Sequence, residues 1–313
     1  MSISFILDNE NKYWDKLISN SSHGTIFSLS SYLDFYKNTF EVLKYVFFDE
    51  ETNNIIACVP IILGDEKPLF NVYNGIIYNQ EILDIESNTR RYSSILSYSE
   101  KIISLLSKKH KNFRLTMNPN FEDLRAFQWH NYNEKKKPQF KIDLRYTGVL
   151  NLKNLNQDQI LLNFRKSRRK EFKKFSNLVS SEGTVEDLIK LYKLTFDRQD
   201  IEIDKNFLKN LTNFCNHAIK KKFGRINFLR NSKGTTVSSS LFVYDSKTAY
   251  SLVAGSDPSY RDELPSSPLT IDQILYFHKK NLNIDFLGIN SPKRGDFKIS
   301  FSPKIVNYFE VTL

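Results

Sequence analysis

The sequence has 313 residues, which is enough for two domains of ordinary size. Apolar residues make up 40% of it and aromatic residues 14%, a content that builds a packed core and excludes a disordered chain. Its 10 glycines and 9 prolines exclude fibrous and low-complexity proteins. The formal charge of +10 at pH 7 favours anionic partners: nucleic acids, phosphorylated small molecules or an anionic membrane surface.

Membrane insertion, secretion and metal binding are not expected. The longest apolar runs, such as Ile55–Leu63, have the length of a strand and not the ~20 residues that cross a bilayer. Met1–Asn9 lacks the basic and apolar regions of a signal peptide, so we expect a cytoplasmic protein, which could bind peripherally at the inner membrane face. Cys58 and Cys215 lie in apolar patterns that favour buried thiols over a disulfide, and the histidines show no metal-ligand spacing. The oligomeric state stays open.

In the first half of the chain, hydrophobic periodicity predicts a helix, a three-stranded meander, a second helix and a further strand. In chain order these elements are Ser30–Tyr36, Val42–Phe48, Ile55–Leu63, Leu69–Ile77, Tyr92–Lys108 and Phe113–Met117. Polar turns at Asp49–Asn54 and Gly64–Lys67 separate the three strands of the meander.

The second half repeats this order of elements. Hydrophobic periodicity predicts two helices, a three-stranded meander, a third helix and two further strands. In chain order these elements are Val185–Phe196, Phe207–Ala218, Ile226–Arg230, Thr235–Tyr244, Thr248–Ala254, Leu269–Lys280, Ile284–Leu287 and Ile305–Thr312. The stretch between the last two strands has no clear periodicity and is predicted to be irregular. An antiparallel meander followed by a helix and one more strand indicates an α+β fold with a mixed, largely antiparallel sheet flanked by helices.

The segment Asn133–Phe140, with three consecutive lysines and a proline, is the predicted boundary between the two halves. We therefore expect one domain over residues 1–140 and a second over residues 141–313. Two such units side by side would form a cleft between them, and domain interfaces are a preferred place for ligand sites.

The strongest local signal is a basic segment. Between Arg165 and Lys174, seven basic residues and one acid supply +6 of the +10. Helical spacing places Arg168 on the same face as Phe164 and Phe172, with Arg165 at the edge of that face. A guanidinium on a packed face needs an anionic partner. Arg168, with Arg165, therefore binds a phosphate or carboxylate of a ligand or forms an internal ion pair, and both alternatives stay open.

Two other segments have side chains suited to anion recognition. Arg198 and Gln199 follow a predicted helix, where they could bind a planar acceptor group or simply cap the helix and meet solvent. The loop Gly255–Ser267 leads into the next helix, whose free N–H groups suit an anion. Ser266 or Ser267 could cap that helix, and an ordinary capped helix start explains the pattern equally well.

Asp285 and Lys298 are the candidates for chemistry. Asp285 lies in an otherwise apolar strand, where it could orient a neighbouring group or belong to a buried ion pair. Lys298 could stabilise a developing oxyanion, or it could be a surface lysine. No nucleophile, Walker A or zincin motif is present, which favours direct transfer to an acceptor by positioning and oxyanion stabilisation.

Several segments of the second half, in their order and spacing, resemble the FemXAB-like branch of the GNAT acyltransferase superfamily. They are the basic helix Phe164–Phe175, Thr195–Gln199, Tyr250–Arg261, Ile284–Gly288, and Phe297-Lys298 followed by Phe301. The resemblance covers about Leu150–Leu313. The first half is similar mainly in architecture, with Gly24–Phe27 as its best local match.

This resemblance implies two tandem GNAT-like domains and the transfer of an acyl group to an amine. It implies a donor site on the strand Ser251–Ala254 and the loop after it, made by Leu252, Val253, Ala254, Ser256, Tyr260, Arg261 and Ser266. The acceptor would be bound by Arg165, Arg168, Arg198, Gln199 and Phe297. Lys298 would lie near the oxyanion, as in the Phe-Lys pair of Fem-type transferases. The sequence does not identify the general base, and Asp285, Glu263 and a water relay stay open as alternatives.

Three functions follow, in order of preference. The first is an N-acyltransferase that uses acyl-CoA as co-substrate, without a bound cofactor, to acylate a nucleotide- or lipid-linked amino sugar in cell-surface polysaccharide biosynthesis. The second is an aminoacyl-tRNA-dependent Fem-type transferase acting on a peptidoglycan precursor, which the +10 charge suits. The third, from another class, is a basic nucleic-acid-binding module without turnover, although no nucleic-acid motif is present.

Overall fold

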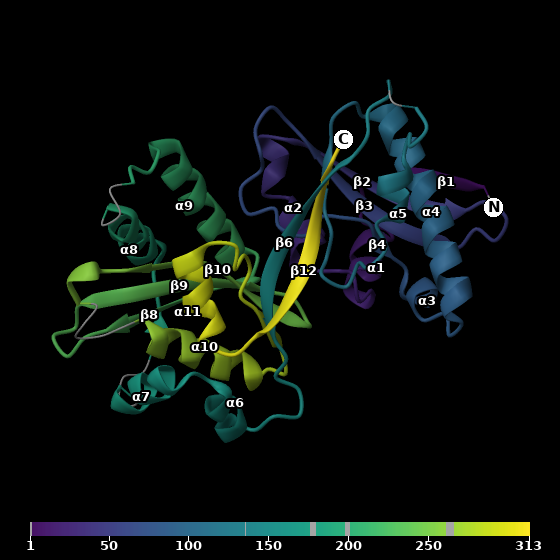
Figure 1. Ribbon diagram of the computed structural model, residues 1–313. Helices are drawn as coiled ribbons and strands as arrows, with labels where there is room; N and C mark the ends of the chain where they lie inside the picture. Colours follow the sequence, from purple (N-terminus) through teal and green to yellow (C-terminus); the bar gives the residue numbers. More distant parts are fainter. Residues whose placement is uncertain (1, 135, 176–179, 198–200, 261–265) are drawn as a thin grey trace. The chain divides into compact units, whose positions relative to one another are not determined.

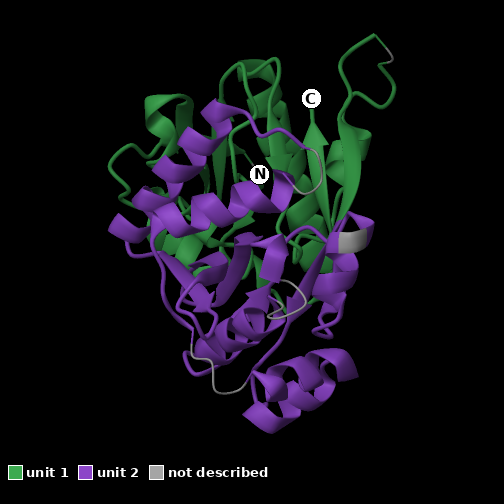
Figure 2. Cartoon of the chain, turned by 90° about the vertical axis from the view of Figure 1, so that its left-hand side faces the viewer, with its two compact units in different colours: residues 1–145, 307–313 green, residues 146–306 purple. Residues whose placement is uncertain are grey.

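The computed structural model describes residues 2–134, 136–175, 180–197, 201–260 and 266–313 (Figure 1). The chain forms two compact units, residues 1–145 with 307–313 and residues 146–306 (Figure 2). The chain passes from the first unit to the second within strand β6 (Lys141–Leu150) and returns within β12 (Lys304–Thr312). The α+β class expected from the sequence is confirmed, with largely antiparallel sheets and flanking helices.

The first unit contains an antiparallel sheet in the order β1-β2-β3-β4. Its strands are β1 (Ile3–Leu7), β2 (Glu41–Asp49), β3 (Ile55–Leu63) and β4 (Ile77–Tyr78). The last residues of the chain also belong to this unit, because the end of β12 pairs antiparallel with β5 (Arg114–Thr116), with Glu310 opposite Thr116. The strands expected over residues 42–48, 55–63 and 113–117 are confirmed to within about two residues at each end.

Helices cover this sheet and complete the core of the first unit. They are α1 (Trp14–Asn20), α2 (Ser30–Leu33), α3 (Gln80–Leu83), α4 (Asn88–Lys109) and α5 (Arg125–Trp129), with 3-10 turns η1 (Ile26–Ser28) and η2 (Tyr36–Asn38). The long helix α4 buries Ile95, Ile102 and Leu106, which recur at helical spacing and pack in one cluster with strand residues such as Phe47 and Val59.

The prediction of a strand at Leu69–Ile77 is wrong. Only the last residue of that stretch is in a strand, β4, which spans Ile77–Tyr78. Before that strand the backbone is held mainly by side chains, besides a hydrogen bond from the Asn74 N–H to the carbonyl oxygen of Thr116. The hydroxyl groups of the buried Tyr32 and Tyr36 donate to the carbonyl oxygens of Phe70 and Leu69, at 2.7 and 2.5 Å. An apolar stretch with alternating residues is therefore not sufficient for a strand when neighbouring side chains bind its carbonyl groups.

The second unit contains a sheet in the order β6-β11-β10-β9-β8-β7. Besides β6, its strands are β7 (Ser181–Glu182), β8 (Gly224–Arg230), β9 (Thr236–Tyr244), β10 (Thr248–Ser256) and β11 (Asn283–Asp285). All pairs in this order are antiparallel except β10 with β11, which are parallel. The expected meander β8-β9-β10 is confirmed.

Helices pack on both faces of this sheet. They are α6 (Gln157–Asn163), α7 (Lys166–Lys174), α8 (Val185–Asp197), α9 (Lys205–Lys220), α10 (Ser267–His278) and α11 (Pro292–Ile299), with the 3-10 turn η3 (Pro258–Tyr260). Helix α10 packs on the face of the sheet that carries the Phe242 side chain of β9. Helix α8 lies against Gly255 of β10, whose pairing partner in β9 is Ser239. Ser239 and Phe242 are three residues apart in one strand, so their side chains point to opposite faces. The stretch expected to be irregular before the last strand contains α11 instead, beginning at Pro292 after Ser291.

Candidate functional site

The central feature of the second unit is a gap in its strand pairing. Strands β10 and β11 pair in parallel from Thr248 opposite Asn283 to Tyr250 opposite Asp285, where β11 ends. Strand β10 continues to Ser256, paired on its other side with β9 and bulged between Ser251 and Val253. Beyond Tyr250, no strand of the described residues pairs with the β11 side of β10. Backbone N–H and C=O groups along this edge can therefore bind an extended ligand.

The predicted donor residues Leu252, Val253 and Ala254 lie on this free part of β10. Leu252 is the bulged residue, since Ser251 pairs with Phe242 and Val253 with Leu241. The side chain of Val253 is buried in the fold, whereas Ala254 is exposed. The strand thus presents its backbone and one small side chain along the edge where pairing with β11 has ended.

Helix α8 packs directly on the end of β10. A Cβ atom at Gly255 would lie 2.4 Å from the backbone nitrogen of Tyr192, so only glycine allows this approach. The Ser256 N–H donates to Thr195 Oγ1 at 2.8 Å, which joins helix and strand. Thr195 therefore has a structural contact at the site, while the other predicted residues of that segment, Arg198 and Gln199, lie outside the described residues.

The start of α10 follows β10 and η3. Ser266 is the N-cap residue, but its side chain makes no capping hydrogen bond, and the Ser267 hydroxyl donates instead to Glu171 on α7. The ring of Tyr260 packs against a small cluster that includes Leu229 and Leu269. Arg261 and Glu263 lie outside the described residues.

Lys298 is in α11, and its side chain reaches the turn after β11. Its Nζ donates to the carbonyl oxygens of Leu287, at 2.5 Å, and Gly288, at 3.3 Å. Burial, helped by the nearby Arg294 and opposed by Asp285, lowers the pKa of Lys298 to about 8. Lys298 is thus a partly buried amine at the carboxyl end of β11, where β10 and β11 have separated.

Asp285 holds the turn to which Lys298 binds. Its side chain is 3% exposed, and Oδ1 accepts hydrogen bonds from Thr147 Oγ1 at 2.5 Å and from the Leu287 N–H at 2.8 Å. Leu287 and Gly288 both have positive φ, 49° and 40°, so this turn has an uncommon backbone conformation. The sequence pattern gave no indication of Thr147 or of the two carbonyl oxygens. The Asp-x-Leu-Gly order after an apolar strand is the signal that could have indicated such a turn.

The predicted acceptor residues form a polar network beside this turn. Arg168 donates to Ser300 Oγ at 2.9 Å and to Glu171 at 2.5 Å, and its guanidinium carbon lies 5.2 Å from the centre of the Phe297 ring. Of the two alternatives for Arg168, the structure contains the internal ion pair. Arg165 makes two hydrogen bonds to Asp296, at 2.8 and 3.1 Å, on an exposed surface. Binding of an acceptor by these residues stays a prediction.

Other chemistry has little support in the described part of the chain. No group of three histidines, cysteines or acidic residues there could hold a metal ion. Cys58 and Cys215 are buried and unbonded, as expected, and burial raises the pKa of each thiol. None of the described helices has both the length and the apolar character to cross a membrane.

Comparisons with known proteins place this geometry in a known class of fold. No protein-family model and no curated protein matches the sequence. Solved structures do match. The crystal structure of FemX is similar over 99% of this chain and 97% of its own, with a TM-score of 0.67 and 11% identity. The tandem GNAT protein from the clavulanic acid biosynthesis pathway is similar over 99% and 98%, with a TM-score of 0.51 and 8% identity.

A third similar structure is the C-terminal domain of a putative lysylphosphatidylglycerol synthetase from Agrobacterium fabrum. It covers 86% of this chain and 83% of its own, with a TM-score of 0.51 and 9% identity. The chain therefore has a tandem GNAT fold like that of FemX, and the resemblance stated above is confirmed at the level of the fold. Identities this low establish the fold and not the activity.

Proposed function

We propose that the protein is an N-acyltransferase that moves an acyl group from acyl-CoA to an amine of a nucleotide- or lipid-linked amino sugar. The observation that carries this proposal is the free edge of β10 beyond Tyr250, together with the Lys298 amine held at the turn after β11. A thioester arm laid along β10 would bind its backbone groups as an added strand does. The donor pyrophosphate would lie near the start of α10, where free N–H groups favour an anion.

The proposed reaction is direct transfer. The neutral acceptor amine attacks the thioester carbonyl carbon, and the carbonyl oxygen becomes an oxyanion beside the Lys298 ammonium. The C–S bond then breaks, the amide forms, and the proton released by the attacking nitrogen ends on the CoA thiol. In this scheme Asp285 is a positioning residue, since its carboxylate holds the Leu287–Gly288 turn whose carbonyl oxygens orient Lys298.

A second donor, aminoacyl-tRNA, is favoured by one feature of the surface. Helix α7 presents Lys166, Lys170 and Lys174, which are exposed and make no ion pair with any described acidic residue. Such unpaired cations suit a polyanion, and the attraction would weaken as salt rises. The acceptor in this case would be a peptidoglycan precursor.

Thermal stability with each candidate donor tests the choice. Acetyl-CoA, a longer acyl-CoA and deacylated tRNA would each be added at two salt concentrations, because a ligand of the folded state raises the melting temperature. A shift with an acyl-CoA that persists in high salt supports the first function. A shift with tRNA alone that disappears with salt supports the second, or plain nucleic-acid binding if no turnover follows.

Turnover is then measured with labelled donor and amino-sugar acceptors. We expect Lys298→Ala to reduce turnover by about 10²–10³-fold, the usual effect of removing an oxyanion-stabilising group, with donor binding retained. Lys279→Ala, at an exposed lysine after α10, is the matched control and should keep full activity. If both variants turn over like the parent protein, Lys298 has no part in the reaction.

A further inference from the structure

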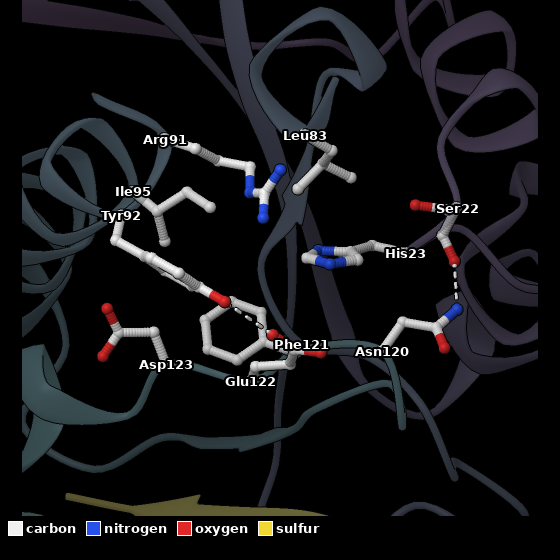
Figure 3. Close-up of a pocket in the computed structure, with 10 residues that line it drawn as sticks. All are labelled: Ser22, His23, Leu83, Arg91, Tyr92, Ile95, Asn120, Phe121, Glu122 and Asp123. Atoms are coloured by element: carbon white, nitrogen blue, oxygen red, sulfur yellow. Dashed lines mark hydrogen bonds between the residues drawn. The ribbon is translucent and has the colours of Figure 1, made fainter. Parts of the chain in front are cut away.

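A second candidate site lies in the first unit, in a pocket of about 200 Å³ (Figure 3). Its lining comes from the loop after α1, from α3 and the start of α4, and from the loop after β5. The residues are Ser22, His23, Leu83, Arg91, Tyr92, Ile95, Asn120, Phe121, Glu122 and Asp123. All belong to one unit, so the pocket does not involve the candidate transfer site in the second unit.

The pocket has an aromatic wall that is fixed by the core. The ring of Phe121 stacks on Tyr78, with centres 6.2 Å apart and planes at 16°, and His23 packs against Phe121 with centres 5.5 Å apart. Tyr78 is fully buried, and its hydroxyl is 2.6 Å from Ser99 Oγ. Ile95, also buried, adds an aliphatic side chain to the pocket. The apolar part of the pocket is therefore formed before any ligand binds.

Hydrogen bonds join the segments at its rim. Asn120 Nδ2 donates to the Ser22 carbonyl oxygen at 2.9 Å, and the Ser22 N–H donates to Gln80 Oε1 at 2.7 Å. Figure 3 shows the first of these contacts at one side of the pocket. A rim held in this way lowers the ordering cost of binding, as in most preformed ligand sites.

A cation without an acidic partner faces this space. The guanidinium of Arg91 donates to the neutral acceptors Ile85 O, at 3.2 Å, and Asn88 Oδ1, at 2.6 Å. It forms no ion pair with any acidic residue that the structure describes. In Figure 3 the guanidinium points into the pocket, between Leu83 and Ile95. Its remaining N–H groups are available to a carboxylate, which a guanidinium binds with two parallel hydrogen bonds.

A carboxylate without a basic partner lines the same pocket. Glu122 Oε2 accepts a hydrogen bond from the Tyr92 hydroxyl at 3.2 Å, and within the described ranges Glu122 makes no ion pair. Asp123 differs, because Arg125 donates to its carboxylate at 2.7 and 2.9 Å and, together with the backbone, holds the pKa of Asp123 below its usual value. Glu122 is thus the acidic group left to bind a cationic ligand.

We propose that this pocket binds a small zwitterion of the amino-acid class, with its carboxylate on Arg91, its ammonium on Glu122 and its apolar side chain on Phe121 and Ile95. The cation of Arg91 and the carboxylate of Glu122, beside an apolar wall, match the two charges and the apolar side chain of such a ligand. The pocket volume of about 200 Å³ is of the size that an amino acid or a small dipeptide fills. This proposal does not depend on the proposed acyl transfer.

The test uses the full chain and measures binding by thermal shift and by saturation-transfer NMR. The probes are the twenty standard amino acids singly, the dipeptide Leu-Gly, N-acetyl-leucine, leucinamide and inorganic phosphate. We expect an amino acid or the dipeptide with an apolar side chain to bind. Blocking either charge should weaken binding by about 10- to 100-fold, the usual effect of losing a charge-assisted hydrogen bond.

Two variants assign the charges. Arg91→Gln should remove the preference for a free carboxylate over the amide, and Glu122→Gln should remove the preference for a free amine over the acetylated form. Arg90→Gln and Glu86→Gln, at exposed residues nearby that do not line the pocket, are the matched controls. The proposal is overturned if no amino acid or dipeptide binds, if both pocket variants bind like the controls, or if phosphate binds as well as the zwitterion.

Discussion

The side-chain nitrogen of Lys298 lies 2.5 Å from the carbonyl oxygen of Leu287, at the end of a strand that has just separated from its neighbour. Two backbone carbonyl groups are neutral partners and do not replace the water that a buried ammonium loses. The pKa of Lys298 falls accordingly from 10.5 to about 8. A shift of this size corresponds to about 3 kcal/mol of cost for the charged form. Perturbed pKa values cluster at functional sites, and this one supports the role proposed for Lys298.

Replacing this charge should separate stability from activity. Lys298→Met keeps an unbranched apolar side chain and removes the buried charge, so we expect a melting temperature that is equal or a few degrees higher at pH 7. Turnover should fall by at least about 100-fold because the oxyanion loses its ammonium. Thermal unfolding and a labelled-donor assay measure the two effects. A variant that is both less stable and fully active would contradict the assignment.

The same lysine predicts a pH dependence of stability. Between about pH 8 and pH 10.5 the unfolded chain keeps a proton on Lys298 that the folded protein has lost, so the free energy of unfolding rises with pH there. Below pH 8 both states are protonated, and the full cost is present. The free energy of unfolding of the parent protein, measured relative to that of Lys298→Met, should therefore rise by roughly 2–3 kcal/mol across this window. Denaturant unfolding at several pH values measures it, and a flat difference would contradict the lowered pKa.

Gly255 should tolerate no side chain. In Gly255→Ala the new methyl group would meet the backbone of Leu191 and Tyr192 at 2.4–2.7 Å, and α8 would have to move off β10. We expect a loss of about 1–3 kcal/mol or more, as for other overpacked sites, and weaker donor binding. Gly234→Asn is the control. Gly234 has no atom within 4 Å of an added Cβ, so the substitution there costs only the backbone strain of its φ of +80°, which asparagine adopts more readily than most residues. We therefore expect a smaller loss of stability than at Gly255 and unchanged donor binding.

The two arginines of the basic segment should behave differently. Arg168→Ala removes a side chain that is 17% exposed and leaves Glu171 without its cation, so it should reduce stability by about 1–3 kcal/mol. Arg165 and Asp296 are 46% and 63% exposed, so Arg165→Ala should leave the melting temperature nearly unchanged. If Arg165 binds the acceptor, its variant raises KM for the acceptor alone. Equal effects of the two variants on stability would show that burial does not distinguish them.

Local sequence patterns determined most of the secondary structure. Apolar residues at helical spacing identified α4, α8, α9 and α10, and alternation or short apolar runs identified β2, β3, β8, β9 and β10. These predictions hold because each depends on residues a few positions apart, whose side chains share one face of a helix or strand. The tandem fold was indicated by the order and spacing of several segments that resemble a known family, with Phe297-Lys298 as one of them.

Tertiary structure decided the partners of each polar group. Residues 69–76 are not a strand, because the hydroxyls of Tyr32 and Tyr36, more than thirty residues earlier in the chain, bind Leu69 and Phe70. Arg168 is paired internally because α7 places Glu171 and Ser300 within reach. The environment of Lys298 depends on a turn ten and eleven positions away, held in turn by Thr147 and Asp285. Contacts between distant residues decide which charges are buried, and no local periodicity specifies them.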